Sequence, residues 1–345
     1  DIEPAAGQVL VKTLCCGICG SDLHALHHMD HMTELARRTG AGGAPPSDGG
    51  AGIVFGHEFS AEILDHGPGA EKRLKAGTRV VSVPTLIRPS GMVSIGYSRK
   101  YPGGFAERMV LSESLLIEVP NGLSSRKAAL TEPFAVGAHA VGRAALDEPA
   151  AVLVIGCGPV GLAVIASLKA KGYGPVTAAD FSPTRRAMAE RLGADRVIDP
   201  AEESPHARWS EMGVPASSFE QIVARTAGQP VKRAVIFECV GAPGVLQSVI
   251  EGAPAGAQIV VAGVCMTPDT IEPITAITKQ IDLRFVYAYT PAEFAEVLRQ
   301  IAEGEMDVEP VITGVVGLDG VANAFEQLSD PESQVKILVE PAAAG

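Results

Sequence analysis

The pattern of hydrophobic and polar positions changes near residue 124, and this change predicts two kinds of domain. Before it, short apolar segments that fit β-strands alternate with glycine- and proline-rich turns. These segments are residues 8–14, 59–64, 79–83, 105–111 and 116–119. Many short strands separated by such turns indicate an all-β barrel or sandwich.

After residue 124, helical and strand-like segments alternate. The predicted strands are residues 152–155, 176–179, 196–198, 234–238, 258–262 and 283–288. The predicted helices cover residues 124–129, 134–145, 183–192, 219–227, 243–252 and 274–280. This α/β alternation predicts a parallel, doubly wound sheet.

The C-terminal segment starts with a capping box at residues 290–293, whose helix ends at Gly304. A strand at 311–315, a helix at 321–328 and a strand at 335–339 follow. This segment is too long to be only a sheet edge, so we expect it to return to the N-terminal domain. The predicted domains are residues 1–133 with 289–345, and residues 134–288.

Residues 25–52 interrupt the N-terminal strands. Residues 25–40 have a helical pattern, and residues 41–52 form a Gly/Pro/Ser-rich loop. Because ordinary loops are much shorter, this insertion is either a lid over a site or a tolerated surface insertion.

A glycine turn follows the first strand of the α/β half. It has the sequence Gly156-Cys157-Gly158-Pro159-Val160-Gly161. Gly156 permits the tight turn, Gly158 lets the backbone approach a pyrophosphate, and Gly161 lets the helix pack on the strand. A second strand then ends at Asp180, about 20 residues further on, where a carboxylate can bind the adenosine ribose. A turn without a ligand is the alternative, but strand, helix, second strand and acid all occur in the order that a dinucleotide site needs.

Asp180 also bears on the choice of cofactor. Its charge would repel a 2′-phosphate, so NAD is predicted in preference to NADP. Arg185 and Arg186 lie nearby in the sequence and weaken this preference, unless they flank the adenine instead.

Composition and charge exclude several classes of partner. The chain of 345 residues has a net charge of −12 and no basic stripe, which argues against nucleic acid. No apolar run is long enough for a bilayer, so no membrane partner is expected. The six cysteines are scattered through a large chain, which favours a reducing cytoplasm.

The N-terminal half carries a candidate metal site. Cys16 and Cys19 have CxxC spacing, and His57 and Glu58 follow Gly56. Cysteine, histidine and glutamate are all zinc ligands, and three protein ligands with one open position make a catalytic site. The CxxC pair alone is also compatible with a redox pair or half of a zinc knuckle, but no second CxxC and no βαβ context support either.

Several motifs together resemble the zinc-dependent medium-chain dehydrogenases, the superfamily of alcohol, polyol and threonine dehydrogenases. They are Gly17-Ile18-Cys19-Gly20-Ser21-Asp22-Leu23-His24, Gly56-His57-Glu58, Gly103-Gly104-Phe105-Ala106-Glu107, Glu132-Pro133-Phe134-Ala135-Val136 and the glycine-turn unit. The resemblance covers nearly the whole chain. It implies a GroES-like β-barrel catalytic domain and a Rossmann domain.

The resemblance implies one catalytic zinc. Cys19 and His57 match the first two ligands, and Glu58 matches a direct ligand or a close neighbour of the metal. Glu132 stands where the polyol and threonine branch has its remaining ligand, and whether Glu58 or Glu132 binds directly stays open. No structural zinc is expected, because residues 83–104 lack the four cysteines that many relatives use.

The resemblance also implies a proton path. Ser21 matches the hydroxyl that touches the substrate alcohol, His24 matches a relay histidine, and Asp22 matches the partner that orients the zinc histidine. Zinc would act as a Lewis acid, and the proton would leave through Ser21, the cofactor ribose and His24. The expected reaction is hydride transfer between NAD and a small secondary alcohol, polyol or amino alcohol, or the matching ketone, in a homodimer or homotetramer.

Two other functions compete with this hypothesis. One is a zinc-free enone or quinone reductase of the same superfamily, and the other is a non-catalytic binding protein that kept the fold. Both are disfavoured by the presence of the ligand, relay and cofactor motifs together. His27, His28 and His31 resemble a ligand cluster, but their spacing is more typical of a solvated helix face.

Overall fold

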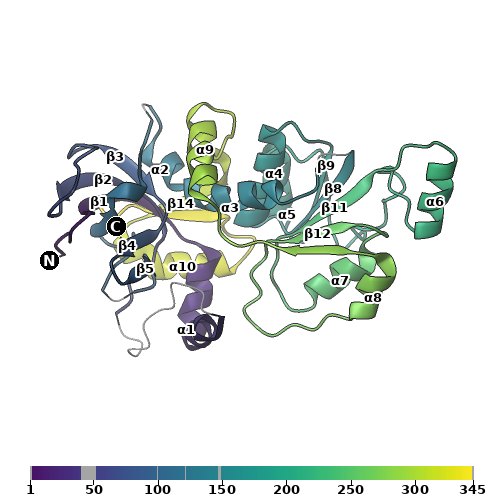
Figure 1. Cartoon of the computed structure of the whole chain (residues 1–345), viewed down its shortest axis with the longest axis horizontal. Coiled ribbons are helices and arrows are strands. Elements are labelled where there is room, and N and C mark those ends of the chain that lie inside the picture. The colour runs from purple at the N-terminus through teal and green to yellow at the C-terminus, as the bar shows by residue number, and fades with distance from the viewer. Residues whose placement is uncertain (1, 40–51, 99, 121, 147–148, 344–345) are drawn as a thin grey trace. The chain divides into compact units, whose positions relative to one another are not determined.

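The computed structural model describes residues 2–39, 52–98, 100–120, 122–146 and 149–343 (Figure 1). Most of the loop predicted over residues 41–52 lies outside the described residues. The chain forms two compact units, Asp1–Pro133 with Pro291–Gly345, and Phe134–Thr290.

The first unit is built on a mixed sheet in which β1 (Gln8–Gly17) is central. Its other strands are β2 (Glu58–His66), β3 (Arg79–Ser82), β6 (Arg108–Ser112), β7 (Leu116–Glu118), β14 (Ile312–Val316) and β15 (Lys336–Val339), and the order is β14-β15-β1-β2-β3-β7, with β6 also pairing with β1. Val9, Val11 and Cys16 of β1 are buried in one apolar core with residues of the neighbouring strands. The sheet therefore combines strands from both ends of the chain.

The helices of this unit are α1 (Gly20–Thr39), α2 (Ser125–Ala129), α9 (Pro291–Ala302) and α10 (Val321–Ser329), together with the short 3₁₀ turns Glu113–Leu115, Glu309–Val311 and Leu318–Gly320. Helix α1 begins directly after the central strand and has non-helical dihedral angles at His28, which mark a kink. The α3 helix (Thr131–Gly142) starts in this unit and continues into the other.

The sequence pattern missed a hairpin between β3 and β6. It consists of β4 (Thr85–Arg88) and β5 (Gly91–Ser94), which pair antiparallel. The strand predicted over residues 105–111 starts only at Arg108. The reason is that the N–H groups of Gly103, Gly104 and Phe105 already bond to carbonyls of residues 54–56, so this stretch is fixed as a loop.

The second unit has a six-stranded parallel sheet in the order β10-β9-β8-β11-β12-β13. The strands are β8 (Ala150–Ile155), β9 (Val176–Ala179), β10 (Arg196–Ile198), β11 (Arg233–Glu238), β12 (Gln258–Val261) and β13 (Asp282–Phe285). The connecting helices are α4 (Pro159–Ala170), α5 (Pro183–Arg191), α6 (Ser218–Thr226), α7 (Val245–Gly252) and α8 (Pro273–Lys279). Figure 1 shows α4 and α5 on one side of this sheet and α7 and α8 on the other, which confirms the predicted doubly wound α/β sheet. Among the described helices, none combines the length and apolar character needed to cross a membrane.

Candidate active site

The site in the first unit begins where β1 passes into α1. Strand β1 ends at Gly17, Cys19 stands directly before α1, and the first turn of α1 carries Ser21 and Asp22. The Asp22 carboxylate accepts the backbone N–H of Cys19 through Oδ2 at 3.0 Å, which satisfies a donor that has no partner inside the helix. This local bond holds Cys19 in place.

The second part of the site lies at the start of β2. His57 and Glu58 follow Gly56, whose φ is +99°. A Cβ on Gly56 would approach the Cys16 sulfur to 2.8 Å and the backbone nitrogen of Phe105 to 2.9 Å, so only glycine fits there. The Gly56-His57-Glu58 motif is thus partly a packing requirement that aims His57 at the start of α1.

Cys19, His57 and Glu58 converge. Their ligand atoms all lie within 4.8 Å of one another, and this is the one such group of three or more metal-capable side chains in the described parts of the chain. His57 Nδ1 lies 3.3 Å from Asp22 Oδ1, which leaves Nε2 as the nitrogen for a metal. A thiolate, an imidazole with an oriented second nitrogen and a carboxylate fit zinc.

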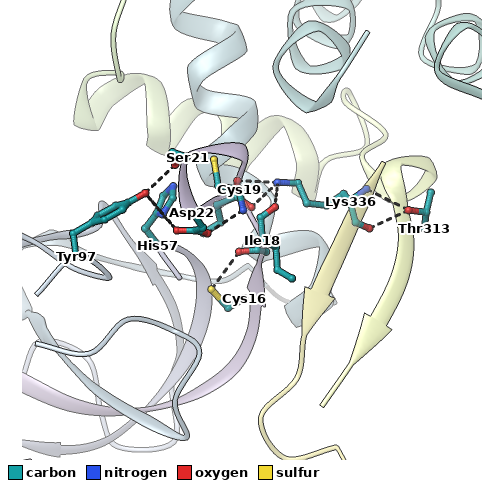
Figure 2. Close-up of polar contacts among 11 residues, drawn as sticks. Cys16, Ile18, Cys19, Ser21, Asp22, His57, Tyr97, Thr313 and Lys336 are labelled. Carbon is teal, nitrogen blue, oxygen red and sulfur yellow. Dashed lines mark hydrogen bonds and ion pairs between the residues drawn. The ribbon is translucent and has the colours of Figure 1, made fainter. Parts of the chain in front are cut away.

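Cys16, the other cysteine of the CxxC pair, is not part of this group. It is buried in the sheet core, and its sulfur bonds to the carbonyl of Gly17 at 3.6 Å (Figure 2). Burial raises the pKa of the Cys16 thiol well above its usual value. The structure therefore supports neither a redox pair nor half of a zinc knuckle.

Glu58 is fully buried and paired with Lys336, a residue that the sequence motifs missed. Lys336 Nζ lies 2.8 Å from each Glu58 oxygen. It also lies 2.9 Å from the carbonyl oxygen of Ile18 (Figure 2). Thr313 on β14 fixes the strand there, because its Oγ1 accepts the N–H of Lys336 at 3.2 Å. The signal in the sequence was one lysine inside the apolar strand 335–339.

The negative charge around Lys336 comes from Glu58, Cys19 and Glu132. Burial alone would lower the pKa of Lys336, but the negative charges of Glu58, Cys19 and Glu132 outweigh it and raise that pKa. Glu132 lies in the first turn of α3 and is buried, although it is outside the group of three that converge. Lys336 therefore balances a cluster of acidic side chains in a place that water does not reach.

Ser21 has a partner that the sequence did not reveal. Its Oγ lies 2.9 Å from the hydroxyl oxygen of Tyr97, just after the β4–β5 hairpin. His24 is half-buried on α1, and burial, followed by the charges of His28 and His27, lowers its pKa below 6.5. A neutral imidazole at this position can accept a proton near neutral pH.

His27, His28 and His31 are exposed, and they line an open hollow of about 630 Å³ together with Ile53 and Phe55. They do not converge as the site ligands do. This agrees with the solvated helix face that their spacing favoured.

In the second unit, the glycine turn lies between β8 and α4. Gly156 has φ of +89°, and a Cβ on Gly161 would collide with the Gly156 carbonyl oxygen. Gly158 is the N-cap of α4 and makes no side-chain cap bond. A Cβ on Gly158 would find only Arg185 Nη1, at 4.0 Å, so the backbone there is open to a ligand. A helix N-terminus of this kind fits a phosphate group.

Asp180 and Arg185 lie beside this turn. Asp180 Oδ2 accepts the N–H of Cys157 at 2.7 Å, and Oδ1 accepts the N–H of Ser182 at 2.8 Å. Each carboxylate oxygen keeps a further lone pair for a ribose hydroxyl. Arg185 Nε is buried and has no hydrogen-bond partner among the described residues, so this side chain has spare capacity for an anion.

Comparisons with known proteins agree with this geometry. The zinc-binding dehydrogenase family model matches residues 159–303, and the alcohol dehydrogenase GroES-like domain model matches residues 5–121. The (R,R)-butanediol dehydrogenase of Bacillus subtilis is 31% identical over 350 residues, which cover 97% of this chain and 93% of that protein. Sorbitol dehydrogenase of Homo sapiens is 26% identical over 337 residues, which cover 94% of this chain and 86% of that protein.

A solved structure of 2R,3R-butanediol dehydrogenase from Bacillus subtilis superimposes with a TM-score of 0.76 at 30% identity, covering 99% of this chain and 94% of that one. The fold and the converging ligands define a zinc-dependent oxidoreductase. The chain belongs to the medium-chain alcohol and polyol dehydrogenase superfamily, whose members use NAD or NADP. The predicted family, GroES-like and Rossmann fold, and enzyme class are confirmed.

Proposed function

We propose that this protein oxidises a small secondary alcohol or polyol with NAD, or reduces the matching ketone, at one catalytic zinc. The observation that carries this proposal is the convergence of Cys19, His57 and Glu58 within 4.8 Å. Butanediol and sorbitol are the substrates that the names of two relatives give, so vicinal diols and polyols are the first compounds to test.

Cys19, His57 and Glu58 would hold the zinc and leave one position open for the substrate oxygen. The bound ion would supply a Lewis acid that lowers the pKa of that hydroxyl. Asp22 keeps the proton of His57 on Nδ1, and Lys336 balances the charge of Glu58. Glu132 is the alternative third ligand, and zinc affinities of Glu58→Gln and Glu132→Gln would decide between the two.

Ser21 would accept the proton of the alcohol, and His24 would release it to solvent. Both lie on α1, and the lowered pKa of His24 keeps its imidazole neutral and able to accept. The nicotinamide supplies the hydride acceptor. The residues of this chain supply position, charge and proton transfer.

The nucleotide would bind at the glycine turn. Gly156, Gly158 and Gly161, with Pro159 and Val160 between them, present the start of α4 to the pyrophosphate. Asp180 would accept ribose hydroxyls, which favours NAD, and Arg185 would lie against the phosphates.

The deciding experiment measures zinc content and NADH formation on one sample with a panel of alcohols that includes butanediol stereoisomers and sorbitol. Cys19→Ser should abolish turnover and zinc binding while circular dichroism stays unchanged. Cys265→Ser is the matched control, because Cys265 is a half-exposed thiol outside the site. Full activity in Cys19→Ser would remove zinc from the mechanism, and a zinc-free wild type that reduces enones would support the reductase alternative.

We also propose that the protein forms a homodimer or homotetramer in the cytoplasm. Strand β13 is last in the order of its sheet, and Phe285 and Tyr287 beside it are 66% and 87% exposed. A second copy could pair there and extend the sheet. Sizing chromatography of Phe285→Lys against wild type tests this, and an unchanged oligomer would exclude this edge. The six free thiols support a reducing compartment.

A further inference from the structure

We propose that Tyr97 is a positioning residue that fixes the hydroxyl of Ser21 and the imidazole of His57 with one side chain. This inference rests on the alcohol dehydrogenase function proposed above. It gives a role in the reaction to a residue outside the motifs that carry the family resemblance.

Tyr97 is held rigidly. It follows the β4–β5 hairpin and comes directly after Gly96, whose φ is +86°. A Cβ on Gly96 would lie only 3.0 Å from the Gly56 carbonyl oxygen, so two loop backbones are in close contact there. The Tyr97 ring also packs edge-on against Phe55, with ring centroids 6.1 Å apart. The position of the phenol is therefore set by the fold.

The hydroxyl of Tyr97 reaches three groups of the site (Figure 2). It lies 2.9 Å from Ser21 Oγ, 3.4 Å from Asp22 Oδ1 and 3.4 Å from His57 Nδ1. The rings of Tyr97 and His57 lie with centroids 5.5 Å apart at a tilt of 35°. One side chain thus touches the residue that would receive the proton and the residue that would bind the metal.

The direction of the bond to Ser21 follows from the chemistry of the groups. The phenol proton has two acceptors in reach, and Ser21 Oγ is the nearer. A phenol is also a stronger acid than a serine hydroxyl, so Tyr97 donates and Ser21 accepts. The proton of Ser21 then points away from Tyr97, and one lone pair of Oγ remains for the substrate hydroxyl.

This arrangement prepares Ser21 to pass a proton on. When the alcohol O–H bond breaks, its proton moves to Ser21 Oγ. Ser21 releases its own proton along the path to His24, and Tyr97 keeps its proton throughout. Without the phenol, the Ser21 hydroxyl can rotate and must be oriented at the moment of reaction. Orientation fixed in advance lowers the barrier.

The first test is Tyr97→Phe, which keeps the ring packing and removes the hydroxyl. We expect kcat for alcohol oxidation to fall about tenfold, which is the worth of one well-made hydrogen bond. The KM for NAD and the zinc content should stay at wild-type values. Tyr101→Phe is the matched control, because that hydroxyl accepts from Arg88 at 3.3 Å and contacts none of the site residues.

A double-mutant cycle separates positioning from general damage. Because Tyr97 acts in part through Ser21, adding Tyr97→Phe to Ser21→Ala should lower kcat by a smaller factor than Tyr97→Phe does in the wild type. Losses that multiply, or a Tyr97→Phe enzyme as active as Tyr101→Phe, would overturn the proposal. A wild type with neither zinc nor dehydrogenase activity would instead be a failure of the proposed function.

The contact with His57 has a readout that does not depend on turnover. In the cobalt(II)-substituted protein, the visible absorption bands report the geometry of the ligands. We expect these bands to shift in Tyr97→Phe and to stay unchanged in Tyr101→Phe. Identical spectra of wild type and Tyr97→Phe would overturn the part of the proposal that concerns His57.

Discussion

Lys336→Met tests the charge balance of the site. The change removes the ammonium group of a side chain that is 2% exposed, and it keeps a side chain of similar length. It leaves the Glu58 carboxylate, which is 0% exposed, without its 2.8 Å partner and frees the Ile18 carbonyl. A buried ion pair broken on one side typically costs about 3–5 kcal/mol, so we expect a loss of that size in the free energy of unfolding.

The assay is urea unfolding of the metal-free protein followed by circular dichroism, with wild type, Lys336→Met, Glu58→Gln and the double variant compared. The double variant should recover at least half of the loss, because a neutral glutamine no longer leaves a buried charge. Trp209, the single tryptophan, lies in the unit 134–290 and reports whether that unit is affected.

Two results would refute this reasoning. One is a Lys336→Met protein whose free energy of unfolding lies within about 1 kcal/mol of the wild-type value. Loss of the buried ion pair would then cost no more than loss of an exposed one. The other is a double variant no more stable than Lys336→Met. Added zinc should reduce the deficit of Lys336→Met, because the bound cation replaces part of the lost positive charge.

Three further changes have defined outcomes. Asp22→Asn should weaken zinc binding about 10–100-fold, because His57 loses the carboxylate that holds its Nδ1 proton. Competition with a chelator measures this affinity, and an unchanged affinity would contradict the expectation. His24→Gln should lower kcat for oxidation about 10–100-fold. It should also remove the fall of kcat at acid pH, because below its lowered pKa the protonated His24 ring cannot accept a proton. A pH profile like that of the wild type would argue against the relay. Asp180→Ser should shift the ratio of kcat/KM values toward NADP, and an unchanged ratio would count against the ribose contact.

Sequence reasoning predicted most of the elements, because glycine turns and apolar periodicity are local signals. It placed the strand at residues 196–198 with the bounds that the structure shows. It missed the β4–β5 hairpin, in which each strand of four residues contains only two consecutive apolar residues and no alternation of apolar and polar positions. It also ended the first strand early, since Cys15 and Cys16 continue β1 to Gly17.

The candidate site also contains residues that local motifs indicate and residues that only long-range contacts bring in. Motif spacing singled out Cys19, His57 and Glu58, and the structure brings their ligand atoms within 4.8 Å of one another. Lys336 and Tyr97 were missed because only long-range packing brings them to the site, from positions 278 and 76 residues away from their partners. A lysine within an apolar strand was a visible clue to Lys336. For Tyr97 the sequence offers no clue beyond its place after a glycine.

The pairing of Glu58 with Lys336 joins two segments of the chain that are synthesised far apart in time. On the ribosome, Glu58 is made early, while its counter-charge follows only after the whole 134–290 unit has been synthesised. Until β15 leaves the exit tunnel, closing the N-terminal strands would bury that carboxylate without its partner, so we expect the nucleotide-binding unit to fold first. A nascent chain stalled before Lys336 should therefore protect the nucleotide-binding unit from protease and leave the strands around Glu58 open to cleavage.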